Sequence, residues 1–201
     1  MGAILFLAME KWIISLLIGY LMGSVPYSYI LVRLVGGYDL RTKGSGNLGT
    51  TNVMRTLGIG YAVLNYALDM LKGAGSFWIS QALFGAPFGL IGGIGATLGH
   101  CFSPFVNFKG GKGVAVASGM LLAADWRILA VLLVVQFGVL FLTRRMSAGS
   151  LTSAASAPVV AWFFNGVTPI FYTALFVGAF VIFQHRANIG RLLRGEEKPL
   201  F

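Results

Sequence analysis

The sequence has very little of what metal-based or covalent chemistry uses: one cysteine, two histidines and six acidic residues in 201 positions. The single cysteine, Cys101, excludes an intramolecular disulfide and any site with several cysteine ligands. The few carboxylates form no cluster along the chain that would hold Mg²⁺. We therefore expect no metal and no cofactor. A covalent route through Cys101 would need an activated thiolate.

Charged residues are scarce as well, and this excludes a soluble domain. They make up 10% of the chain, against about 25% in soluble proteins. In contrast, 57% of the residues are hydrophobic and the mean hydropathy is +0.81. The composition predicts an all-α, polytopic integral membrane protein. The formal net charge of +9 indicates basic cytoplasmic loops that contact anionic lipid headgroups, and we expect no nucleic-acid partner.

Long apolar runs predict about seven transmembrane helices. The runs lie at about 4–33, 57–72, 75–98, 113–124, 127–143, 151–164 and 167–184. A spanning helix needs about 20 residues, so the shorter runs are candidate half-helices, and Pro26 is a candidate kink in the first run.

Charge predicts how these helices are oriented. With the N-terminus outside, seven crossings place every lysine and arginine except Lys11, Lys72 and Arg127 on one side. The positive-inside rule makes that side, together with the C-terminus, cytoplasmic. We expect residues 1–201 to form a single transmembrane domain whose first helix is retained and not cleaved as a signal peptide.

Lys43–Arg55, here called the first segment, is glycine-rich and polar. Its glycines predict a turn that leads into a helix beginning near Thr50 or Thr51, where a threonine hydroxyl would cap the helix. The free N–H groups at such a helix start bind anions, and Arg55 shares a helical face with Thr51. The alternative is an ordinary capped loop between helices.

Gly99–Gly113, the second segment, combines glycines with Lys109 and Lys112. Glycines let several backbone N–H groups point at one spot, so this composition favours a phosphate held at a membrane surface. The nucleotide P-loop pattern is excluded, because Val106 stands where it needs glycine and Gly113 where it needs serine or threonine. The alternative is a basic anchor on the cytoplasmic side.

Three further polar residues stand in or beside the apolar runs: His100, Asp69 and Lys72. His100 is the candidate general base by residue type. A familiar acyltransferase arrangement has an aspartate five residues after the histidine, but Phe105 occupies that position. No local carboxylate orients His100, and a structural histidine is the alternative. The i, i+3 spacing of Asp69 and Lys72 predicts an ion pair with a structural role.

His185–Lys198, the third segment, follows the last apolar run. If the preceding helix continues into it, His185 and Asn188 share one face, and Arg186 lies on another that is turned toward headgroups. The alternative is a basic juxtamembrane tail. Earlier in the chain, Ser150 follows a short basic loop and is a candidate cap for the next helix.

Several of these motifs match a known family when they are taken in order. The matching residues are Gly44-Ser45-Gly46-Asn47, Thr51-Asn52 and Arg55; Asp69 and Lys72-Gly73; Leu98-Gly99-His100 and Phe108-Lys109-Gly110-Gly111-Lys112-Gly113; Ser150; and His185-Arg186, Asn188-Ile189 and Arg191-Leu192-Leu193. They run through almost the whole chain and resemble the PlsY family, the bacterial membrane glycerol-3-phosphate acyltransferases that use acyl-phosphate. Thr50, where the family usually has alanine, departs from the pattern.

The resemblance implies a seven-helix fold with the three segments on the cytoplasmic face of the bacterial inner membrane. It implies transfer of an acyl chain from acyl-phosphate to the 1-hydroxyl of glycerol 3-phosphate. The products would be lysophosphatidic acid and inorganic phosphate, in the first step of bacterial phospholipid synthesis. The implied partners are these two substrates, the lipid bilayer and, as a candidate, the enzyme that makes acyl-phosphate.

Residue by residue, the resemblance also assigns roles. The catalytic residues would be Ser45, Arg55, Lys112, His185 and Asn188. The substrate-binding residues would be Gly44, Gly46, Asn47, Thr51, Asn52, Lys109, Gly110, Gly111, Gly113 and Ser150. Within the second segment, the residues from Lys109 to Gly113 inherit a role in binding glycerol 3-phosphate. Glu197 matches a glutamate linked to structural integrity and joins Asp69 and Lys72 as a structural residue.

The expected chemistry needs no acyl-enzyme, because an acyl-phosphate is already activated and phosphate is its leaving group. This agrees with a chain that shows no Ser-His-Asp or Cys-His motif. We expect direct attack by the acceptor hydroxyl, with proton loss assisted by the substrate's own phosphate and with Arg55 and Lys112 stabilising the developing charge. The alternative function is a membrane transporter of a phosphorylated metabolite, which would use similar basic, glycine-rich helix ends.

Overall fold

A computed structural model describes residues 2–201, with side chains from residue 9 onward. Every regular element in this described range is a helix, as the composition predicts. Backbone packing divides the chain into two compact units, the first ending at Ala124 and the second running from Asp125 to Phe201.

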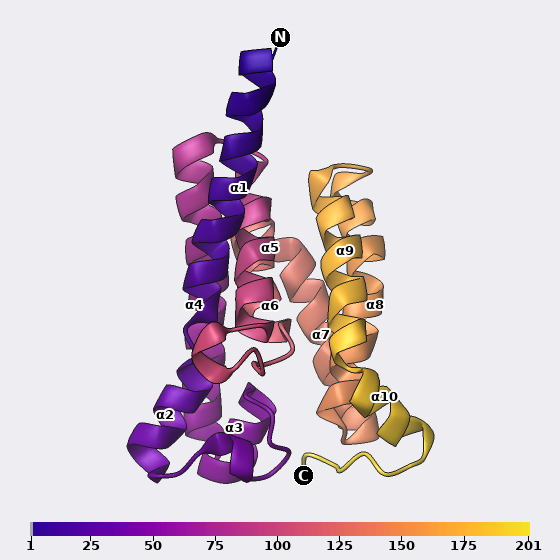
Figure 1. Ribbon diagram of the computed structural model, residues 1–201. Helices are drawn as coiled ribbons and strands as arrows, with labels where there is room; N and C mark the ends of the chain where they lie inside the picture. The colour runs from indigo at the N-terminus through magenta and orange to yellow at the C-terminus, as the bar shows by residue number, and fades with distance from the viewer. Residues whose placement is uncertain (1) are drawn as a thin grey trace. The chain divides into compact units, whose positions relative to one another are not determined.

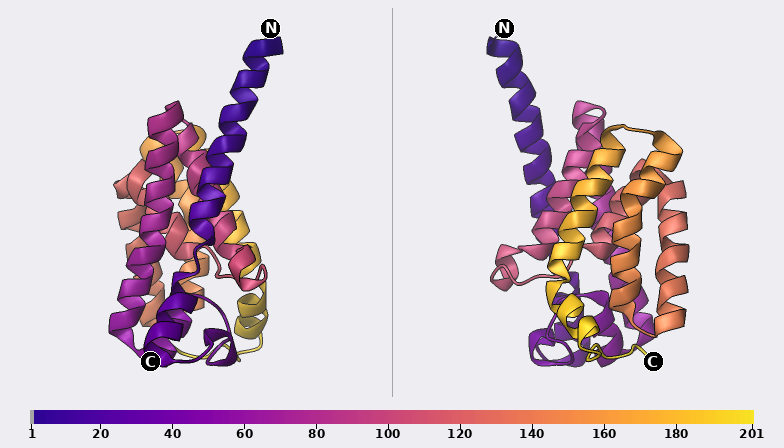
Figure 2. Two further views of the ribbon diagram at one scale, coloured as in Figure 1. Left: turned by 60° about the vertical axis from the view of Figure 1, so that its left-hand side comes forward. Right: turned by 90° about the vertical axis from the view of Figure 1, so that its right-hand side faces the viewer.

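The first unit is built around a group of long apolar helices. Its elements are α1 (Gly2–Ser24), α2 (Tyr27–Gly36), η1 (Leu40–Thr42), α3 (Thr50–Leu57), α4 (Ile59–Phe84), α5 (Phe88–Cys101), η2 (Pro104–Val106) and α6 (Val114–Ala124). α1 packs on α4 and α5, and α4 packs on α5 and α6 (Figure 1). The short helices α2 and α3 lie beyond the end of α1 that is remote from Gly2 (Figure 2).

The predicted kink at Pro26 is confirmed, because α1 ends at Ser24 and α2 begins at Tyr27. Proline has no N–H to donate, and its ring clashes with the preceding helical turn. The break leaves the Val25 carbonyl outside the regular helical pattern, and Lys72 Nζ in α4 donates to it at 2.9 Å.

Glycines bring α1 and α5 into backbone contact. A Cβ atom on Gly19 would collide with the carbonyl oxygen of Gly92. One on Gly23 would collide with that of Ala96, and one on Gly95 with the backbone of α1. Small residues at a helix interface allow close van der Waals packing where lipid replaces water. We call this contact the α1–α5 glycine seam, formed by Gly19, Gly23 and Gly95.

The predicted break between the runs at 57–72 and 75–98 is wrong. α4 continues without interruption through Gly73, and the chain turns instead at Gly85, whose φ is +81°. A Cβ atom on Gly73 would collide with the carbonyl oxygen of Val116 in α6. Glycine is therefore needed at this position for a close helix contact and not for a turn.

The second unit consists of α7 (Trp126–Thr143), α8 (Met146–Asn165), α9 (Pro169–Gln184) and α10 (Arg186–Leu193), drawn from orange to yellow in Figure 1. α8 packs on both α7 and α9. The turn before α8 is short because Arg144, with φ +57°, ends α7 in the left-handed region. α8 therefore begins earlier than predicted, and Ser150 lies buried inside it. The prediction that Ser150 caps this helix is wrong.

The last apolar helix does not continue straight into the third segment. α9 ends at Gln184, α10 begins at Arg186, and the two helices are bent by 60° relative to each other. His185 lies at the bend and belongs to the end of one helix and the start of the other.

Three segments of the described chain are long and apolar enough to cross a membrane: Met9–Gly36, Phe88–Val106 and Trp126–Thr143. The bent pair α9 and α10 would be a fourth. α6 is a shorter apolar helix, which agrees with the predicted run at 113–124. The count of about seven crossings and their orientation stay predictions.

Candidate active site

The first segment begins with a tight loop whose backbone is hydrogen-bonded to the buried side chain of Asn52. Gly44 and Gly46 have φ values of +59° and +69°, which favour glycine. Asn52 is 1% exposed. Its Oδ1 accepts a hydrogen bond from the Ser45 N–H at 2.9 Å, and its Nδ2 donates to the Lys43 carbonyl at 3.0 Å. Asn52 therefore shapes the loop, and Ser45 lies on the exposed side of it.

α3 begins at Thr50, as the glycine-rich turn predicts, but its cap differs from the prediction. Gly49 is the residue before the first turn, and no side chain caps the helix, so the predicted threonine cap is wrong. Thr50 Oγ1 instead accepts a hydrogen bond from Asn65 Nδ2 at 3.0 Å. An alanine at this position would have no oxygen to accept this bond. Further along α3, Thr51 is half-buried and Arg55 is exposed.

The second segment folds back on the end of α5. The Gly110 N–H donates to the Cys101 carbonyl at 3.0 Å, and the Gly111 N–H donates to the His100 carbonyl at 3.1 Å. A Cβ atom on Gly110 would collide with the His100 carbonyl oxygen, and one on Gly111 with Nε2 of the His100 ring. Both glycines are needed because the loop lies directly against His100. Gly113, with φ +88°, then turns the chain into α6.

The first and second segments meet within the first unit. Asn47 Nδ2 donates to the Gly110 carbonyl at 3.5 Å, and a Cβ atom on Gly111 would also crowd the carbonyl oxygen of Leu48. Lys112 follows directly and is half-buried. The predicted residues carried by these two segments are Gly44, Ser45, Gly46, Asn47, Thr51, Asn52, Arg55, Lys109, Gly110, Gly111, Lys112 and Gly113.

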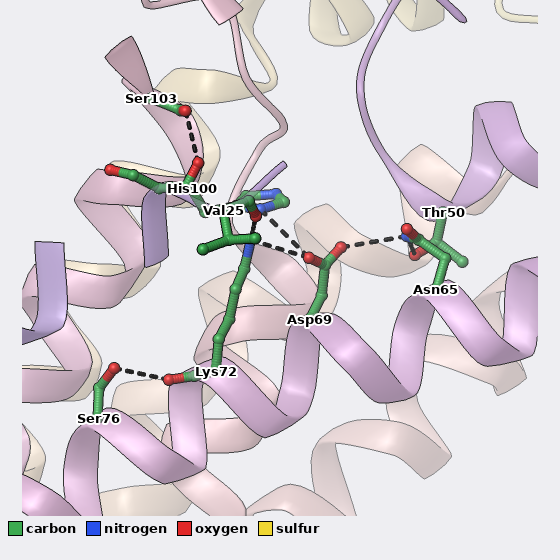
Figure 3. Close-up of polar contacts among 9 residues, drawn as sticks. Val25, Thr50, Asn65, Asp69, Lys72, Ser76, His100 and Ser103 are labelled. Atoms are coloured by element: carbon green, nitrogen blue, oxygen red, sulfur yellow. Dashed lines mark hydrogen bonds and ion pairs between the residues drawn. The ribbon is translucent and has the colours of Figure 1, made fainter. Parts of the chain in front are cut away.

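The predicted ion pair of Asp69 and Lys72 is confirmed, with Nζ 2.9 Å from Oδ1 and both side chains buried. His100 Nδ1 lies 3.6 Å from the same carboxylate oxygen (Figure 3). The carboxylate that the local sequence did not supply to His100 therefore comes from α4. The sequence motifs do not identify Asn65, whose Nδ2 donates to Asp69 Oδ2 at 3.1 Å. The one sequence signal for this contact is that Asn65 stands four residues before Asp69, on the same helical face.

In the second unit, Glu197 is the centre of a hydrogen-bonded cluster. Its Oε1 accepts from Ser147 Oγ at 2.7 Å and from Asn188 Nδ2 at 2.6 Å, and its Oε2 accepts from Arg191 Nε at 2.5 Å. Burial raises the pKa of Glu197, but the hydrogen bonds from Ser147, Arg191 and Asn188 outweigh burial and hold the pKa below its usual range. These contacts fasten the third segment to the start of α8.

The other predicted residues of the second unit are also buried. His185 Nδ1 lies 2.8 Å from the Val181 carbonyl oxygen, which favours the tautomer with its proton on Nδ1. Asn188, in α10, directs its amide to Glu197. Ser150, in α8, is buried as well.

The Glu197 cluster should make the stability of the fold depend on pH. Because the folded pKa lies below the usual value of 4.5, the carboxylate stabilises the fold above that value, and this contribution is lost as the pH falls through the folded pKa. We expect Glu197→Gln to lower Tm at neutral pH, since hydrogen bonds to a charged group contribute about 1.5–3 kcal/mol. The Tm of the variant should also fall less than that of the wild type when the pH is lowered from about 6 to about 3.5.

Thermal unfolding of the purified protein, followed by circular dichroism, measures both effects. Glu196→Gln is the matched control, because Glu196 is an exposed neighbour that forms an ion pair with the exposed Arg194. Equal Tm changes in the two variants would contradict a stabilising role specific to Glu197.

Comparisons with known sequences place this chain among enzymes of one kind. The family model described as glycerol-3-phosphate acyltransferase matches residues 13–195. The chain is 41% identical over 185 residues to the glycerol-3-phosphate acyltransferase of Erythrobacter litoralis (strain HTCC2594), which covers 92% of each chain. It is 41% identical over 192 residues to that of Synechococcus sp. (strain JA-3-3Ab), which covers 94% of this chain and 95% of the relative.

Solved structures agree with the sequence comparison. The crystal structure of PlsY (YgiH), an integral membrane glycerol 3-phosphate acyltransferase, in its glycerol 3-phosphate form matches with a TM-score of 0.87 and 36% identity over 94% of both chains. The lysophosphatidic acid form of PlsY matches with a TM-score of 0.84 and 34% identity, again over 94% of both chains. The predicted all-helical membrane fold is thereby confirmed, and the chain belongs to the glycerol-3-phosphate acyltransferase family.

Proposed function

We propose that this protein transfers an acyl chain from acyl-phosphate to the 1-hydroxyl of glycerol 3-phosphate, giving lysophosphatidic acid and inorganic phosphate. Family membership supports an acyltransferase that acts on glycerol 3-phosphate. The observation that carries the proposal is the junction of the first and second segments, where Asn47 contacts Gly110. Glycine N–H groups, Lys112 and Arg55 on these segments suit two substrates that each carry a phosphate.

The proposed reaction is a direct displacement at the acyl carbon. The 1-hydroxyl oxygen attacks this carbon and forms the ester bond, and the bond between the acyl carbon and the phosphate oxygen breaks. The phosphate leaves with the bonding electron pair, and the hydroxyl proton passes to a phosphate oxygen of glycerol 3-phosphate. Arg55 and Lys112 stabilise the negative charge that develops in the transition state.

Other residues and the cellular setting belong to the same proposal. Ser45 is a further catalytic residue on the first segment, and the family resemblance adds His185 and Asn188 as catalytic residues and Ser150 as a substrate contact. The protein would cross the bacterial inner membrane about seven times and act on the cytoplasmic side, supplied by the enzyme that makes acyl-phosphate. A transporter is not retained, because the chain belongs to a family of enzymes.

The decisive experiment measures phosphate release by the purified protein from palmitoyl-phosphate, with and without glycerol 3-phosphate and without added metal. Mass spectrometry follows lysophosphatidic acid in the same samples. We expect phosphate release that requires the acceptor and matches the lipid product mole for mole. An untouched acyl-phosphate, or hydrolysis that is independent of the acceptor, would overturn the proposed donor.

Cys101 provides a test of the direct route. Its side chain is buried, and the Gly110 N–H bonds to its backbone carbonyl, which a substitution keeps. We expect Cys101→Ala to transfer acyl chains at nearly the wild-type rate. Mass spectrometry of the intact wild-type protein after incubation with palmitoyl-phosphate alone should show no acyl adduct. A thioester on Cys101 together with an inactive variant would establish a covalent route instead.

A further inference from the structure

The first unit holds a buried charged cluster for which the proposed reaction has no use. Asp69, Lys72 and His100 are 2%, 4% and 8% exposed. Asp69 Oδ1 lies 2.9 Å from Lys72 Nζ and 3.6 Å from His100 Nδ1 (Figure 3). Buried ions in a membrane domain are energetically costly, and such groups are commonly retained for function.

From Asp69 the cluster reaches the first segment. Asp69 Oδ2 accepts a hydrogen bond from Asn65 Nδ2 at 3.1 Å, and the same amide donates to Thr50 Oγ1 at 3.0 Å. Figure 3 shows Asn65 lying between Asp69 and Thr50. Because Thr50 is the first residue of α3, the start of this helix is connected to the buried carboxylate.

From His100 the cluster reaches the second segment. The His100 carbonyl accepts the Gly111 N–H at 3.1 Å. The Nε2 edge of its ring stands where a Cβ atom on Gly111 would be. One side of the imidazole therefore faces Asp69, and the other lies against the backbone of the loop that precedes Lys112.

Lys72 connects the cluster to a third place, the break between α1 and α2. Its Nζ donates to the Val25 carbonyl at 2.9 Å. The adjacent Ser24 carbonyl accepts from Ser103 Oγ at 2.6 Å. The cluster of Asp69, Lys72 and His100 thus contacts the break between α1 and α2 and the second segment directly. It reaches the first segment through the side chain of Asn65.

We propose that Asp69, Lys72 and His100 form a positioning cluster that fixes the second segment against the first and thereby sets the affinity for the phosphate of glycerol 3-phosphate. This inference rests on the proposed function of the two segments. A glycine-rich loop has many accessible conformations, and ordering it on binding lowers affinity. The imidazole, with Asp69 on one side and the Gly111 backbone on the other, keeps this backbone in place before the substrate binds. His100 acts through the loop and not as the base.

The test compares His100→Gln and Asp69→Asn with Tyr66→Phe as the matched control. Tyr66 also lies in α4, and its hydroxyl donates to Ser118 Oγ in α6 at 3.0 Å. Initial rates of lysophosphatidic acid formation give kcat and KM for glycerol 3-phosphate at saturating palmitoyl-phosphate. We expect KM to rise by about tenfold in both cluster variants with kcat nearly unchanged. Tyr66→Phe should change neither value.

The expected split between KM and kcat separates positioning from other roles. A large fall in kcat at constant KM for His100→Gln would make His100 a base and overturn the proposal, and so would unchanged values of both. If Asp69→Asn fails to fold, His100→Gln carries the test, because it leaves the ion pair of Asp69 and Lys72 in place. The wild-type reaction tests the proposed function separately: without product from the wild type, that function fails before any variant is compared.

A double-mutant cycle tests whether the effect passes through the loop. Gly111→Ala places a methyl group against the His100 ring, so it should raise KM by the same route as His100→Gln. We expect the two changes in KM to be clearly less than multiplicative when combined, because residues in contact couple. Fully multiplicative changes would overturn the assignment of His100 to the loop. Inhibition by inorganic phosphate, measured in the same variants, should weaken in parallel with KM.

Discussion

Lys112→Ala is expected to lower kcat by about 100-fold or more, because removing one group that stabilises transition-state charge has this effect in other enzymes. Lys112 is half-buried and follows two glycines whose backbone is tied to the end of α5. Its position is therefore set by the fold. Arg55→Ala should have an effect of similar size from α3, whereas Lys112→Arg should retain more activity than Lys112→Ala because it keeps the charge.

Steady-state rates with palmitoyl-phosphate and glycerol 3-phosphate check this prediction, with Tm as the measure of folding. Lys11→Ala is the matched control, since it removes an exposed lysine of α1 that lies outside the three segments. Near wild-type rates for folded Lys112→Ala and Arg55→Ala would remove both residues from the proposed mechanism.

Gly110→Ala is expected to abolish productive binding of glycerol 3-phosphate. The added Cβ would collide with the carbonyl oxygen of His100 and crowd that of Cys101. Both obstacles are backbone atoms at the end of α5, which cannot rotate away as a side chain does. The loop must therefore move, and the hydrogen bonds that Gly110 and Gly111 donate to α5 are lost with it. We expect KM for glycerol 3-phosphate to rise by at least about 100-fold, the equivalent of about 2.7 kcal/mol.

The matched control is Gly138→Ala in α7, where a Cβ atom meets nothing within 4 Å. This substitution should leave KM unchanged and slightly raise Tm, because alanine is a better helix former than glycine. Direct binding of glycerol 3-phosphate, measured by calorimetry, distinguishes a displaced loop from a slower chemical step. Wild-type affinity in Gly110→Ala would contradict the close contact between this loop and His100.

The sequence predicts the elements whose signal is local. Charge depletion and apolar runs are sufficient to predict an all-helical membrane protein. Pro26 alone is sufficient to predict the break between α1 and α2. The pairing of Asp69 with Lys72 follows from helical spacing within α4. In each case the residues that decide the outcome are neighbours along the chain.

Most of what the sequence does not predict depends on contacts between distant residues. Gly73 suggests a turn in the sequence, but its role is set by the carbonyl of Val116 in another helix. The carboxylate beside His100 is Asp69, which no spacing rule connects to it. The same reason explains why the junction of Asn47 with Gly110 was not predictable. The cap predicted at Ser150 fails for a local reason instead, because the left-handed Arg144 ends α7 and α8 already begins at Met146.

The α1–α5 glycine seam has a consequence for how this chain can be recombined with its relatives. At Gly19, Gly23 and Gly95 the opposing atoms are backbone, so every other amino acid is too large on either side. Neither helix can change at the seam unless its partner moves away at the same time. In chimeric enzymes, α1 and α5 should therefore be inherited together from one parent. Crossovers that separate the two helices should yield less folded protein than crossovers placed after α6.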